Sequence, residues 1–130
     1  MKYFYALVNK DAGSAYGVHF PDLPGCFSAA DVVEDVMPNA CEALELWFED
    51  TAEVRPSPLD EVREMAARDL AEGAFIIAVP RIRRMGKLVR ANISLDRGML
   101  DAIDRAADER SLTRSAFLAD AARNEIERRR

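Results

Sequence analysis

The segment from residue 90 to residue 126 constrains the fold of this chain more than any other. It reads as one short strand followed by two amphipathic helices. In the strand, Ala91, Ile93 and Leu95 alternate with polar residues, and alternate side chains of a strand point to opposite faces, so one face is apolar. A lone strand leaves its backbone hydrogen-bonding groups unpaired, and no other strand lies nearby in this segment. The same strand of a second copy is the simplest partner, which predicts a dimer with a two-stranded antiparallel ribbon.

The polar face of this strand carries residue types that can read DNA. A two-stranded ribbon fits the major groove, where Arg and Asn can hydrogen-bond to guanine and adenine edges. The alternative is an ordinary edge strand with a solvated face, and the strand taken alone favours that alternative. The two helices that follow at the right spacing reverse this preference.

Residues 90–126 resemble the ribbon-helix-helix family of dimeric DNA-binding domains. The shared pattern is a strand, an acidic cap, a Leu-x-x-Ile helix, a polar turn, a Ser/Thr cap and an Ala-rich second helix. The resemblance implies that DNA bases are read by Arg90, Asn92 and Ser94. It implies that phosphates are anchored by Thr113, Arg114 and Ser115. A Thr at this place can also cap a helix, and a helix N-terminus favours phosphate. The expected dimer core comprises Ile93, Leu95, Leu100, Ile103, Phe117 and Leu118.

Charge is divided sharply along the chain. Residues 1–80 hold 5 Lys/Arg and 15 Asp/Glu, a net charge of −10. Residues 81–130 hold 13 Lys/Arg and 8 Asp/Glu, a net charge of +5. This asymmetry indicates two surfaces with different partners: nucleic acid for the basic part and a basic protein for the acidic part. The alternative is that the acidic helices serve only solubility, and charge alone leaves that alternative open.

Composition excludes several classes of protein. A chain of 130 residues that is 49% hydrophobic can hold one domain or two small ones. No long uncharged apolar run predicts a membrane span, and the N-terminus does not resemble a signal peptide. Cys26 and Cys41 lie among apolar neighbours and are expected to be reduced core residues of a cytoplasmic protein. One histidine and two cysteines are too few for a zinc site without carboxylates, and we expect no cofactor.

The N-terminal residues predict a mixed domain of strands and helices. The expected strands cover residues 2–9, 15–20, 26–29 and 73–80, and the last of them is expected to be central. A capping box of Asp31 and Glu34 is expected to open a long helix, and residues 59–71 form a second helix. Pro38 either kinks the long helix or lies in the first turn of a helix that restarts there.

The run from Phe20 to Asp50, F-P-D-L-P-G-C-F-S-A-A-D-V-V-E-D-V-M-P-N-A-C-E-A-L-E-L-W-F-E-D, resembles the HicB antitoxin family. The preceding hairpin and the strand G-A-F-I-I-A-V-P fit as well, so both resemblances together cover nearly the whole chain. Two positions depart from the family pattern, because Ala30 stands where a Gly is usual and Pro38 replaces a good helix former. Both concern the entry of the long helix.

The resemblance implies an α+β fold, with an N-terminal βββαβ-type partial RNase H-like domain and a C-terminal dimeric ribbon-helix-helix. The implied divisions are a toxin-binding domain at residues 1–80, a linker at 81–88 and a DNA-binding domain at 89–130. The implied partners are a HicA-like ribonuclease toxin, which cleaves mRNA with a histidine, and palindromic operator DNA. The chain would form a homodimer or a tetramer, bind no membrane and repress its own operon. We expect apolar toxin contacts from the F-P-D-L-P-G loop or the sheet edge.

Two other functions stay open at this stage. An N-terminal nuclease would need several carboxylates that converge on two metals, and the first strand supplies none. His19 has no Ser or Cys nucleophile at a recognisable spacing, and the spacing of Glu42, Glu45 and Glu49 favours a solvated helix face. We therefore expect no catalytic residue and no metal site. The second alternative is a stand-alone transcription regulator whose N-terminal domain senses a ligand or only oligomerises.

Overall fold

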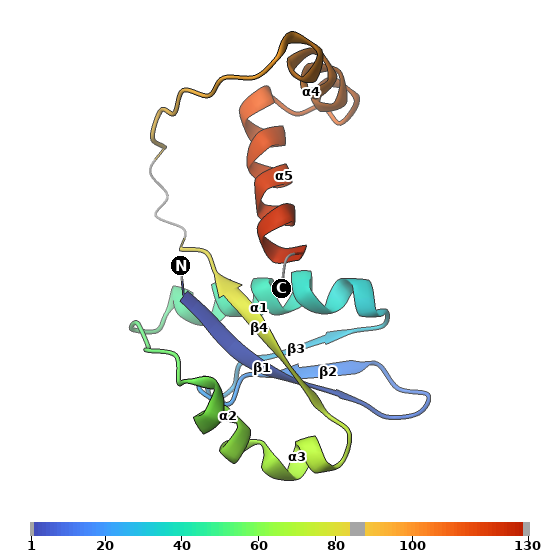
Figure 1. Cartoon of the computed structure of the whole chain (residues 1–130), viewed down its shortest axis with the longest axis vertical. Coiled ribbons are helices and arrows are strands. Elements are labelled where there is room, and N and C mark those ends of the chain that lie inside the picture. The colour runs from blue at the N-terminus through green and yellow to red at the C-terminus, as the bar shows by residue number, and fades with distance from the viewer. Residues whose placement is uncertain (1, 84–87, 129–130) are drawn as a thin grey trace. The chain divides into compact units, whose positions relative to one another are not determined.

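The computed structural model describes residues 2–83 and 88–128 (Figure 1). Contacts between residues divide the chain into an N-terminal unit, which covers residues 1–84, and a C-terminal unit, which covers residues 85–126. The fold is a mixed α+β fold with one antiparallel sheet of four strands among the described residues. No helix in the described part of the chain has the length and apolar character needed to cross a membrane.

The sheet of the N-terminal unit contains β1 (Lys2–Lys10), β2 (Tyr16–His19), β3 (Phe27–Ala30) and β4 (Phe75–Arg81). Their order in space is β3-β2-β1-β4, and each neighbouring pair is antiparallel. The predicted hairpin and third strand are thus present. The expected central place of the fourth strand is wrong, because β4 lies at the edge. Pro80 gives the reason, since proline cannot donate to a sheet ladder and is confined largely to edge strands. Arg81, assigned to the linker from sequence, is the last residue of β4.

Helices cover both faces of this sheet (Figure 1). One face packs against α1 (Val36–Glu49), and the buried cluster there includes Phe4, Ala6 and Val8 of β1 together with Leu44 of α1. Tyr5 points to the other face, where it lines a hollow with residues of α2 (Leu59–Met65) and α3 (Ala67–Ala71). The alternation along β1 therefore supplies two apolar faces, as expected for a strand that is covered on both sides.

The long helix begins later than the sequence indicated. A short 3-10 helix, η1 (Val33–Asp35), precedes α1, and neither helix start has a side-chain cap hydrogen bond. The predicted capping box of Asp31 and Glu34 is therefore wrong. Pro38 is the third residue of α1, a place where a backbone N–H has no intrahelical partner to lose. Of the two predicted roles for Pro38, the structure confirms the second, in which this proline lies in the first turn of a helix.

The helix expected over residues 59–71 is divided at Ala66, which leaves α2 and α3 as separate short helices. Two helical hydrogen bonds nevertheless continue across the break. The Ala66 N–H donates to the Val62 carbonyl at 2.9 Å, and the Leu70 N–H donates to the Ala66 carbonyl at 2.9 Å. The interruption is thus a local bend, which explains why the residue pattern reads as one helix.

The C-terminal unit contains α4 (Arg97–Glu109) and α5 (Arg114–Arg128) up to Ile126. Asp96 caps α4, because its carboxylate accepts the Met99 N–H at 3.0 Å. Ser111 has a left-handed backbone with φ 56° just after α4, and the Leu112 N–H closes the turn on the Ala107 carbonyl at 2.8 Å. This is the Schellman arrangement, which satisfies the last carbonyls of a helix and reverses the chain toward the next one.

Candidate functional site

Residues 88–95, which precede α4, form neither helix nor strand in the single chain, and all of them are exposed. The predicted base-reading residues Arg90, Asn92 and Ser94 lie in this segment. The side chain of Ile93 is 63% exposed and that of Leu95 is 42% exposed, so the predicted apolar face is uncovered. The ribbon itself needs a second copy of the chain, and it stays a prediction.

The segment meets the two helices at a small cavity. Five of the predicted site residues line this cavity of about 300 Å³: Ile93, Ser94, Leu95, Leu100 and Arg114. Of the other predicted dimer-core residues, Ile103 is buried within the unit, whereas Phe117 and Leu118 are half-buried. The structure thus brings together residues from the segment, from α4 and from the start of α5.

The start of α5 was predicted to anchor phosphate. Thr113 caps the helix, because its hydroxyl accepts the Ala116 N–H at 3.1 Å, and Ser115 is exposed in the first turn. Arg114 makes a bidentate ion pair with Asp104 of α4, with Nε–Oδ1 and Nη2–Oδ2 distances of 2.8 Å. This hydrogen-bonded pair lowers the pKa of the Asp104 carboxyl and raises the pKa of the Arg114 guanidinium. Arg114 therefore ties α4 to α5, a role that sequence reasoning missed.

The F-P-D-L-P-G loop of the N-terminal unit is part of the core. Phe20 and Leu23 of the loop and Cys26 just after it are almost completely buried, whereas Pro24 is exposed, so the two large apolar side chains of this loop are not available as toxin contacts. The Asp22 carboxylate accepts two hydrogen bonds from Ser57, one from the backbone N–H at 2.8 Å and one from the hydroxyl at 2.7 Å. These contacts hold the loop against the entry of α2, and they explain the motif structurally.

Exposed aromatic side chains lie instead on the two edge strands of the sheet. Phe27 on β3 is 69% exposed and Phe75 on β4 is 43% exposed. Edge strands also present unpaired backbone groups that can bind another chain. Of the two predicted sources of apolar toxin contacts, the sheet edge offers exposed aromatic side chains, whereas the loop exposes Pro24.

The residues weighed for metal or acid–base chemistry do not converge. Within the described ranges, no group of three or more His, Cys, Asp and Glu side chains is placed to hold a metal ion. Both cysteines are buried thiols, and burial raises the pKa of Cys26 to about 11. Its thiol donates to the Ala43 carbonyl at 3.6 Å. These cysteines are core residues, as predicted.

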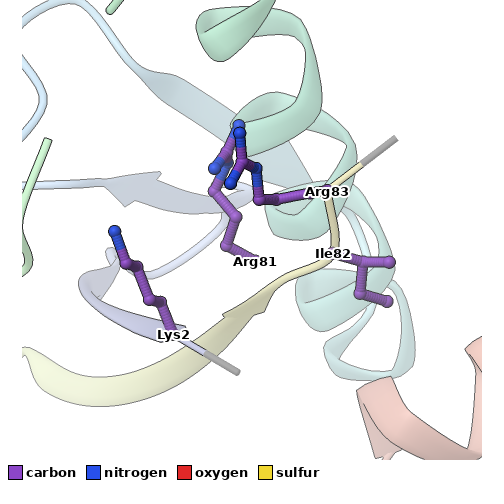
Figure 2. A pocket seen from close by; sticks show the side chains of 4 residues that line it. All are labelled: Lys2, Arg81, Ile82 and Arg83. Atoms are coloured by element: carbon purple, nitrogen blue, oxygen red, sulfur yellow. The ribbon is translucent and has the colours of Figure 1, made fainter. Parts of the chain in front are cut away.

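A basic pocket of about 370 Å³ lies where the first and last strands of the N-terminal unit meet (Figure 2). Lys2, Arg81, Ile82 and Arg83 line it. Lys2 of β1 stands opposite Arg81 of β4 in the strand register, and Figure 2 shows Ile82 pointing away from the three cationic side chains. Sequence reasoning missed this pocket, because only strand pairing brings together residues from opposite ends of the unit.

The chain resembles known proteins over most of its length. The family model for the HicB-like antitoxin of bacterial toxin–antitoxin systems matches residues 4–122. An uncharacterised 14.9 kDa protein from the rep-hol intergenic region of Haemophilus phage HP1 is 30% identical over 130 residues, covering 94% of this chain and 96% of that protein. The crystal structure of antitoxin HicB3 matches with 28% identity and a TM-score of 0.50, over 95% of this chain and 97% of that one.

A structure of a HicA3 and HicB3 toxin–antitoxin complex contains a chain with the same fold, at 22% identity and a TM-score of 0.53. The match covers 62% of this chain and 99% of that one. The family assignment rests on the model match, which covers far more than half of the chain. The chain therefore belongs to the HicB-like antitoxins of bacterial toxin–antitoxin systems.

Proposed function

We propose that this chain neutralises a HicA-like, mRNA-cleaving toxin and represses its own operon by binding palindromic DNA, both in the cytoplasm. Family membership supports an antitoxin. The observation that carries the DNA-binding part is the exposed segment 88–95, which presents apolar and polar residues in alternation before two capped helices. The chain would inhibit by covering the toxin, so the proposal assigns it no catalytic residue, metal or cofactor.

In the proposed DNA complex, two copies of residues 90–95 pair as an antiparallel ribbon in the major groove. Pairing would cover Ile93 and Leu95, and it would leave Arg90, Asn92 and Ser94 on the face toward the bases. The start of α5 would bind backbone phosphate through its N-terminal N–H groups, which Thr113 caps, through the exposed hydroxyl of Ser115 and through the half-exposed guanidinium of Arg114. The Arg114–Asp104 pair would set the direction of α5 at that contact.

In the proposed toxin complex, charge brings the partners together and the sheet edge holds them. Residues 1–80 carry a net charge of −10, and a toxin that binds RNA needs a basic surface. The acidic unit can therefore occupy the surface that RNA phosphates would use, with a fast and salt-sensitive association rate. The exposed aromatic residues Phe27 and Phe75 are the proposed apolar contacts.

Mutation of the ribbon tests the DNA-binding part. Arg90→Ala and Asn92→Ala should each weaken binding to the operator by roughly 1–3 kcal/mol per contact and relax specificity at one base pair of each half-site. Arg105→Ala removes the same charge from an exposed position of α4 and is the matched control. Equal losses for Asn92→Ala on operator and on random-sequence DNA would contradict direct base reading.

Co-expression with the toxin encoded by the neighbouring reading frame tests the other part. The fragment should end after Arg83 rather than after Pro80, because Arg81 completes β4 opposite Lys2. This fragment should restore growth and intact mRNA without specific binding to the operator, because it lacks the ribbon. Phe27→Ser and Phe75→Ser should each weaken the complex, with Arg55→Ala as an exposed control in the same unit. Continued killing by the toxin in the presence of soluble, folded fragment would show that the C-terminal unit is required.

A further inference from the structure

The basic pocket of the N-terminal unit places like charges directly opposite one another. Lys2 and Arg81 are register partners on β1 and β4, and Arg83 lines the same hollow. Directly opposed residues of an antiparallel pair have Cβ atoms about 5 Å apart, at which like charges destabilise the pairing. Such an arrangement is explained if an anion occupies the pocket.

The carboxylate contributed by the chain compensates only part of this charge. Glu53 pairs with the Arg81 guanidinium at 2.7 Å, and it lies 3.9 Å from the Nε of Arg83. Arg81 also stacks on Phe48, with its guanidinium carbon 3.7 Å from the ring centroid, so its side chain is fixed and only 11% exposed. In the part of the chain that the structure describes, the ion pairs at this pocket thus set three cations against the Glu53 carboxylate.

Two of these cations remain available to a ligand. The side chain of Arg83 is 61% exposed, and its distance to Glu53 is at the outer limit of an ion pair. Among the described residues, no carboxylate pairs with the Lys2 ammonium, which points to the same side as the two guanidinium groups in Figure 2. The cavity of about 370 Å³ between them has room for a tetrahedral anion.

We propose that this pocket binds a backbone phosphate of DNA just outside the segment read by the ribbon. The inference rests on the proposed DNA-binding function and adds a second DNA contact from the N-terminal unit. Arg83 precedes Arg90 by seven residues, and a chain of that length spans at most about 25 Å. A duplex held at the ribbon carries a phosphate charge every 1.7 Å or so along its axis, so phosphates of the flanking DNA lie within that reach.

The salt dependence of DNA binding by the full-length chain tests this site. The probe is a fluorescent random-sequence duplex of about 30 base pairs, since a phosphate contact does not depend on base sequence. Each lost phosphate contact lowers the slope of log affinity against log salt by about 0.9. The double variant Lys2→Ala, Arg83→Ala should therefore reduce the slope by about 2 for a dimer, which has two pockets.

Two control variants separate the pocket from net charge and from folding. Arg55→Ala with Arg68→Ala removes the same charge from exposed positions of the same unit outside the pocket, and it should leave the slope nearly unchanged. Lys2→Arg with Arg83→Lys keeps both charges and should restore the slope. The fluorescence of Trp47, the single tryptophan, checks that each variant is folded.

The outcomes distinguish this proposal from the proposed function. An unchanged slope in the pocket variant, or an equal fall in the charge control, would overturn the phosphate site while leaving DNA binding by the ribbon intact. A wild-type chain that binds neither this duplex nor the operator would overturn both. Repeating the titration with single-stranded RNA of equal length identifies the source of the phosphate, and a larger loss for RNA than for DNA would reject the operator-flanking role.

Discussion

The dimer ribbon can be tested by removing one apolar side chain, Ile93. This side chain is 63% exposed in the single chain, where it lines a cavity with Leu95 and Leu100. Ile93→Ala removes three carbon groups, worth about 0.8 kcal/mol each when they are fully buried. If the ribbon covers the exposed 63%, the loss is about 1.5 kcal/mol per chain and about 3 kcal/mol per dimer. The dimer dissociation constant should then rise about 100-fold.

The matched control is Leu88→Ala, which also removes three carbon groups but from a position outside the predicted dimer core. Leu88 is 97% exposed, and its replacement should change the dissociation constant less than about threefold. Sedimentation equilibrium of the full-length chain without DNA measures both values. Equal effects of the two substitutions would refute the assignment of Ile93 to the core, and a wild-type chain that is monomeric at micromolar concentration would refute the ribbon itself.

Three further predictions concern stability and reactivity. Asp22→Ala should lower the free energy of unfolding, followed by Trp47 fluorescence, by about 2–3 kcal/mol, because two hydrogen bonds from Ser57 to a charged acceptor are lost. Asp22→Asn should cost less than about 1 kcal/mol, since the amide keeps one acceptor and gains a donor, and equal costs would argue against this network. The thiol of Cys26 should resist iodoacetamide at pH 8 in the folded chain and react faster only as the pH rises toward its pKa of about 11, because the reactive thiolate forms there. Rapid labelling of the native protein at pH 8 would contradict the burial of this thiol. Ser111→Gly should stabilise the C-terminal unit by up to about 1 kcal/mol and so raise its midpoint of thermal unfolding, because glycine has no Cβ to strain at a positive φ. A lower midpoint would reject that reasoning.

Local patterns in the sequence determined the elements of this protein. The alternation along β1 and the hairpin to β2 are short-range features, and so is the cap of Asp96 on α4, which reaches only three residues along the chain. Such signals act between near neighbours, so they can be read without tertiary structure. The F-P-D-L-P-G motif with the helix after it also indicated the family, and the family model confirmed it.

Tertiary structure decided which residues meet. The edge place of β4, the pairing of Arg114 with Asp104, and the pocket that joins Lys2 to Arg83 all depend on partners far apart in sequence. The predicted start of the long helix was wrong because Asp31 and Glu34 have the spacing of a capping box. Packing of the sheet against Val36 and Ala40 determines where α1 begins. Local preference is worth about 1 kcal/mol per cap, and burial of an apolar helix face outweighs it. The sequence therefore determined the kinds of element and the family, and long-range packing determined their order, their exact limits and the surfaces they form.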